Sequence, residues 1–142
     1  EWEKYAEYMF SYMWLEDYLL NVIDNEKMQK KATGYVIYNM NHAVKMNPHD
    51  IWPKYWLAYF KTEKAKLSNK KSAFKAAISE WENFFNEDAA YTCPALLQAY
   101  RRIAYCYSEL GDKAQKQLYF EKAKRLADIF PFNSMNEYYF GY

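Results

Sequence analysis

YRRIAYCYSELGDK, residues 100–113, is the stretch of sequence that decides the fold. Its apolar residues recur at the three- and four-residue spacing of a helix with one buried face: Tyr100, Ile103, Ala104, Tyr107 and Leu110. Gly111 can adopt the left-handed conformation that ends a helix, and Asp112 can cap the next one. A second apolar stripe follows and stops at Pro131: Phe120, Ala123, Ala127 and Phe130. The stretch therefore predicts a helical hairpin.

The rest of the chain carries altered versions of this pattern. We expect helices over about 2–22, 27–46, 50–67 and 71–85, and two more that begin at Pro94 and near Lys113. Asp50 can cap the third helix, and Pro53 is accepted in its first turn. Gly34 lies inside the second helix at a cost of about 1 kcal/mol relative to alanine. A close approach of a neighbouring helix is one reason to tolerate that glycine.

Short turns and the lack of β-alternation predict an all-α fold of three stacked antiparallel hairpins. We expect a single domain over 1–142, with hairpins at about 2–47, 50–86 and 94–130. Ser134 and Glu137 form a capping box ahead of three aromatic residues, so residues 132–142 should start a partial seventh helix. Because a stacked array exposes an apolar face at its last hairpin, we expect an internal or N-terminal piece of a longer array.

The composition bounds the function. The chain has 142 residues, is 51% hydrophobic, and has 16 tyrosines and 5 tryptophans, which suits a large core and protein interfaces. A net charge of +1 gives no field that recruits nucleic acid, and no apolar run approaches the ~20 residues of a membrane span. Cys93 and Cys106 should lie about 20 Å apart along a helix, too far for a disulfide. Two free thiols favour a reducing compartment such as the cytoplasm.

The last hairpin resembles the tetratricopeptide repeat, which favours a large–Leu–small–Tyr pattern in its first helix and Phe and Ala in its second. The residues that carry the resemblance are Tyr100, Ile103, Ala104, Tyr107, Gly111, Phe120 and Ala123. Val36, Met40, Ala43 and Pro48 resemble the second helix of such a repeat, and Trp56 more loosely the first. Ala43 and Ala123 are 80 residues apart, which gives a period of 40, longer than the family's 34 and nearer to HEAT-type arrays. Lys116 also stands where the family has a small residue.

No arrangement of residues indicates an enzyme. The three glycines are too scattered for a phosphate-binding loop, and no serine or cysteine lies in a catalytic motif. His42 and His49 lack the spacing that places two imidazoles on one helical face, so a metal site with Asp50 is disfavoured. We expect no catalytic residue, no metal and no cofactor.

The resemblance implies a protein–protein interaction module, a scaffold or adaptor that binds a peptide or partner protein in a concave groove. In the family the first helix of each hairpin lines that groove. The corresponding positions here are Lys54, Leu57, Lys61, Lys64, Gln98, Arg101, Arg102 and Tyr105. Arginine suits carboxylates, so the expected ligand is a protein or an acidic peptide.

Charge is distributed unevenly along the chain. Residues 1–26 contain seven acids against one base, whereas residues 61–75 contain six lysines against Glu63. This polarity favours an acidic partner or head-to-tail self-association, with solvated lysines as the simpler explanation. Three other roles stay open: a structural subunit that uses exposed aromatics as interfaces, a chaperone-type adaptor for acidic peptides, and an accessory domain of an enzyme.

Overall fold

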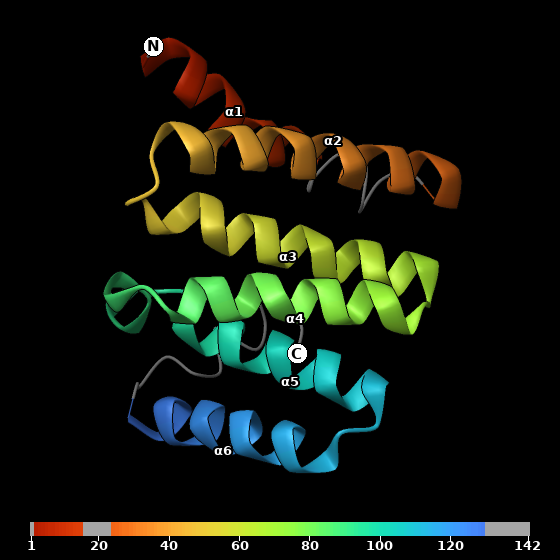
Figure 1. Cartoon of the computed structure of the whole chain (residues 1–142), viewed down its shortest axis with the longest axis vertical. Coiled ribbons are helices and arrows are strands. Elements are labelled where there is room, and N and C mark those ends of the chain that lie inside the picture. The colour runs from red at the N-terminus through yellow and green to blue at the C-terminus, as the bar shows by residue number, and fades with distance from the viewer. Residues whose placement is uncertain (1, 16–23, 130–142) are drawn as a thin grey trace.

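The computed structural model describes residues 2–15 and 24–129, which form six α-helices and one short 3₁₀ helix (Figure 1). The helices are α1 (Trp2–Leu15), α2 (Glu26–Met46), α3 (Ile51–Ser68), α4 (Lys71–Phe85), α5 (Leu96–Leu110) and α6 (Lys113–Ile129). The 3₁₀ helix η2 (Asp88–Thr92) lies in the segment predicted as a loop. Since these ranges contain no strand, the predicted all-α class is confirmed for the described chain.

The helices lie across the long axis of the molecule and follow one another in chain order (Figure 1). Each helix packs against the next, and α3 also contacts α5. The predicted pairings of α1 with α2, α3 with α4 and α5 with α6 are therefore confirmed. The expected seventh helix and Phe130 lie outside the described residues.

Local capping interactions fix several of the helix boundaries. The Asp50 carboxylate accepts a hydrogen bond from the Trp52 amide at 3.1 Å, and Asp112 accepts one from the Gln115 amide at 3.1 Å. Gly111 ends α5 with a φ of 77°. These three predictions are confirmed, because a cap depends only on residues a few positions apart. The fifth helix begins at Leu96 rather than at Pro94.

The explanation offered for Gly34 is wrong. Gly34 is exposed, and a Cβ atom added there would meet nothing within 4 Å. No neighbouring helix therefore requires a glycine at this position.

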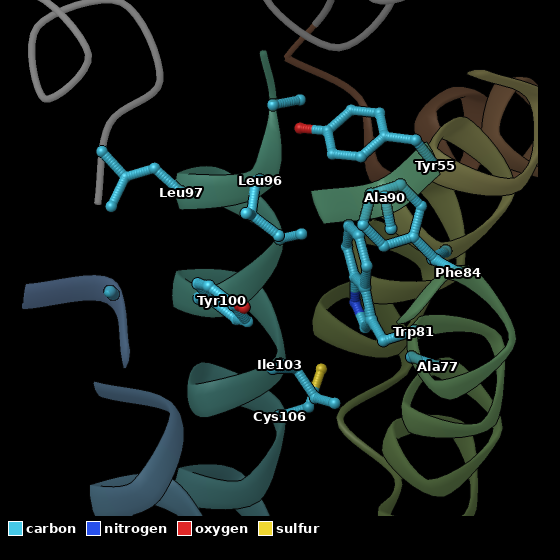
Figure 2. Close-up of a cluster of buried hydrophobic side chains, with 14 of the residues drawn as sticks. Tyr55, Ala77, Trp81, Phe84, Ala90, Leu96, Leu97, Tyr100, Ile103 and Cys106 are labelled. Atoms are coloured by element: carbon cyan, nitrogen blue, oxygen red, sulfur yellow. The ribbon is translucent and has the colours of Figure 1, made fainter. Parts of the chain in front are cut away.

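The main core lies between α3, α4, α5 and α6, and its centre is Trp81. Figure 2 shows Trp81 and Phe84 of α4 directed toward α5. The Trp81 indole nitrogen donates a hydrogen bond to the Thr62 hydroxyl at 2.9 Å, and that hydroxyl donates to the Ala58 carbonyl at 2.9 Å. The polar atoms of this tryptophan and threonine are thus satisfied inside an apolar core.

One residue of the predicted α6 stripe is wrong. Ala123 and Ala127 are buried as expected, but the Phe120 side chain is 53% exposed. Tyr119 is turned into the core instead, where its ring stacks on Tyr107 with centroids 5.9 Å apart. Neighbouring aromatics on a helix point about 100° apart, so only one of the two can face α5.

A second, smaller core joins the N-terminal helices to α3. Val36 and Met40 of α2 pack with Leu57 and Phe60 of α3, and all four are buried. The Tyr5 hydroxyl of α1 donates a hydrogen bond to the Asp50 carboxylate, the residue that caps α3. This bond ties α1 to the stack through a residue 45 positions away.

Candidate interaction surfaces

Four of the eight predicted groove residues lie on α3, and three of them form contacts within the fold. Lys54 forms an ion pair with Glu87, the N-cap residue of η2, and the Lys61 ammonium lies 3.0 Å from the Glu80 carboxylate of α4. Leu57 is buried in the smaller core. Lys64 alone among these four is exposed.

Lys54 and Leu57 share a pocket of about 370 Å³ between α2, α3 and α4. Val44 contributes an apolar wall, and the α4 side of the pocket is polar: Glu80, Asn83, Asn86 and Glu87. The Lys54–Glu87 pair neutralises part of this lining. The pocket therefore lacks the excess of positive charge that an acidic peptide requires.

Arg102 holds α5 against α3. Its guanidinium lies 3.5 Å from the centre of the Tyr59 ring, and its Nη1 atom lies 2.8 Å from Glu63 Oε1. Burial alone would raise the pKa of Glu63, but the charges of Arg102 and Lys66 outweigh burial and lower that pKa below its ordinary value. The Arg102 side chain is 3% exposed, and its charge is balanced within the fold by Glu63. Gln98, another of the predicted groove residues on α5, is also buried.

Arg101 and Tyr105 line a larger groove between α5 and α6, of about 630 Å³. Small residues form much of its lining, which lets the groove reach close to the helix backbones: Ala104, Ser108, Ala123 and Ala127. Tyr105 and Phe120 add aromatic surface. The charged residues in the lining are three bases and one acid: Arg101, Lys116, Lys124 and Asp128. The groove thus combines an apolar surface with a net positive charge.

Of the residues that line this groove, only Arg101 and Tyr105 were predicted, and those that sequence reasoning missed include Lys116, Phe120 and Lys124. The sequence contains one signal for them, because Lys116 stands where a tetratricopeptide repeat has a small residue. A small residue at that position suits close helix packing, whereas a lysine keeps its charge in water. Phe120 was predicted to lie in the core because its spacing from Ala123 and Ala127 also fits the buried stripe of α6.

Large exposed apolar side chains gather on the first two helices and on the last. Their positions are Trp2, Phe10, Met28, Tyr35, Tyr38, Met46, Tyr91, Leu118, Phe120 and Ile129. Apart from Tyr91, which lies in η2, all belong to α1, α2 or α6. The three central helices, all within the described ranges, expose none of this size.

His42, Cys93 and Cys106 pack against other residues of the fold. His42 stacks on Tyr8 with ring centroids 5.2 Å apart and meets Tyr38 edge-on at 4.5 Å. Among the residues that the structure describes, no group of three His, Cys, Asp or Glu side chains is placed to hold a metal ion. Cys93 and Cys106 are both free and buried, as their separation predicted, and burial raises the pKa of Cys106 to about 11.

Together these features define an all-helical protein that exposes large apolar side chains near the ends of its described stack. A comparison with known proteins found no match to a family model, a curated protein or a solved structure. Within residues 2–15 and 24–129, no helix combines the length and the apolar character needed to cross a membrane.

Proposed function

We propose that this chain is a non-enzymatic protein-interaction module, a tetratricopeptide-like stack of hairpins that serves as a structural subunit of a larger assembly. It contacts its partners through the two ends of the described stack. The observation that carries this proposal is the position of the exposed large apolar side chains on α1, α2 and α6. Exposed apolar patches on a folded protein mark sites of association, because they are costly to leave in water.

The concave-groove function implied by the family resemblance has weaker support. Leu57, Gln98 and Arg102 are buried, and Lys54 and Lys61 already pair with the carboxylates of Glu87 and Glu80. A peptide in that groove would have to compete with these contacts. Binding at the stack ends needs no such rearrangement, since Phe120 and Tyr38 are already exposed.

Affinity purification of the full chain from its native source, followed by mass spectrometry, tests the proposal. Phe120→Ser and Tyr38→Ser should each remove a set of co-purified proteins without a change in melting temperature. Lys75→Ser, at an exposed position of α4, is the matched control and should retain every partner. Loss of partners only with Lys64→Glu, on α3, would instead favour a site on the central helices.

A further inference from the structure

We propose that the outer face of α1 in one copy docks into the α5–α6 groove of a second copy, so that copies associate head to tail. This inference rests on the proposed function and names one partner for the stack ends. Its occupant is a second copy of this chain, because α1 and the groove are complementary in charge, residue spacing and apolar character.

The outer face of α1 is an acidic, aromatic surface. Trp2 and Phe10 are 75% and 58% exposed, and Glu3 and Glu7 are exposed between them. Glu3, Glu7 and Phe10 lie on one side of the helix, since positions three, four and seven apart share a face, and Trp2 lies at the edge of that side. The side of α1 that faces the stack is occupied, because Tyr5 is buried with its hydroxyl on Asp50, and the Trp2 ring packs beside Tyr5 with centroids 5.7 Å apart. The face is therefore an amphipathic surface that no other described element covers.

The groove offers the opposite charge. Lys116 and Lys124 are exposed at its α6 side, and Arg101 lies at its α5 side. Helix α6 as a whole contains five basic residues against two acidic ones. Exposed Phe120 provides the apolar contact for a tryptophan or phenylalanine. Helix-in-groove recognition uses this combination of apolar anchors and flanking charge.

The spacings of the two surfaces agree. Trp2 and Phe10 are eight residues apart, as are Lys116 and Lys124, and eight helical residues span about 12 Å. Glu3 and Glu7 lie about 6 Å apart along α1, within the length that the two lysines bracket. A single helix face in a groove buries less area than a standard interface, so the association should be weak and sensitive to salt.

The contact must form between copies. Helix α1 lies near one end of the stack and α6 at the other, so one copy cannot reach its own groove with its own α1 (Figure 1). When two different surfaces of successive copies meet and the arrangement does not close into a ring, further copies can add without limit. The mean size should therefore rise continuously with protein concentration.

Sedimentation velocity on the full chain, with variants at both surfaces, tests this arrangement. E3K/E7K reverses the α1 face, and K116E/K124E reverses the groove charge. Each variant alone should weaken self-association by about tenfold or more, because opposed like charges replace attraction. An equimolar mixture of the two variants should recover association that grows with concentration, since the intact pair of surfaces and the doubly reversed pair both bring opposite charges together. Lys75→Glu, at an exposed position of α4, is the control and should associate like the wild type.

Several results would overturn the inference. A wild type that stays monomeric at every concentration would exclude the second copy and leave the proposed function to its own test. A mixture that shows no complex would show that the two surfaces do not meet. K116E/K124E that leaves self-association unchanged would show that the basic groove does not hold the α1 face.

Discussion

Replacing Glu63 by glutamine should destabilise the fold by about 2 kcal/mol. The Arg102 side chain is 3% exposed and lies 2.8 Å from the Glu63 carboxylate, whose side chain is 21% exposed. Breaking a fully buried ion pair costs about 3–5 kcal/mol, whereas an exposed pair contributes about 0–1 kcal/mol. The partial exposure of Glu63 places this pair between the two cases. In a chain of this length, about 2 kcal/mol lowers the melting temperature by roughly 6 °C.

Urea unfolding followed by circular dichroism measures this difference. The dependence of the unfolding free energy on urea should be unchanged, so that the shift in midpoint reports stability alone. Glu26→Gln is the matched control, because Glu26 pairs with Lys30 at 2.9 Å but both side chains are more than half exposed. That control should lose less than about 0.5 kcal/mol.

The effect of Glu63→Gln should also depend on pH. The pKa of Glu63 is lower in the folded protein than its ordinary value of 4.5. Its stabilisation is therefore fully present above the unfolded-state pKa and is lost as the pH falls through the folded-state pKa. The unfolding free energy of the wild type should therefore approach that of Glu63→Gln as the pH falls. Two results would refute this account of the Arg102–Glu63 pair. One is a loss of unfolding free energy in Glu63→Gln no larger than that in Glu26→Gln at pH 7. The other is a difference between wild type and Glu63→Gln that does not shrink in acid.

Three further predictions concern the core and the turns. Trp81→Phe should lower the free energy of unfolding by about 2 kcal/mol, since it removes a buried hydrogen bond and leaves a small cavity. A decrease of less than about 0.5 kcal/mol would contradict the packing described for Trp81. Gly34→Ala should raise the unfolding free energy by about 0.5–1 kcal/mol, because the site is open and helical, whereas Gly111→Ala at φ 77° should lower it by about 1 kcal/mol. Equal signs for the two glycines would be inconsistent with their backbones. Iodoacetamide at pH 8 should label Cys106 only after unfolding, because burial raises its pKa to about 11; rapid labelling of the native protein would contradict that burial.

Features of the fold that depend on neighbouring residues were predictable from the sequence. Asp50, Asp112 and Gly111 determine helix ends through bonds and dihedral angles within a few residues, and all three act as predicted. The buried stripe of α2 was equally accessible, because Val36 and Met40 share a face by periodicity alone.

Contacts between distant residues were not predictable in the same way. Arg102 meets Glu63 across 39 positions, and nothing in the local pattern separates a buried arginine from one in a groove. Periodicity also fits Phe120 as well as Tyr119, although only the tyrosine packs on Tyr107. The choice depends on the rotation of α6 against α5, which the whole interface determines. For the same reason, the sequence did not predict a groove between α5 and α6, although Lys116 departs there from the family pattern.

The distribution of charge decides which kind of self-association the stack can support. A symmetric dimer would place two α1 faces together, with Glu3 and Glu7 opposite their own copies, or two grooves together, with Lys116 and Lys124 opposite theirs. Both arrangements oppose like charges, and like charges across an interface are costly. Only the contact between unlike ends brings the acidic face to the basic groove. A dimer that pairs like faces is therefore disfavoured by the same residues that favour the contact between α1 and the groove, and high salt should reduce both the repulsion and the attraction.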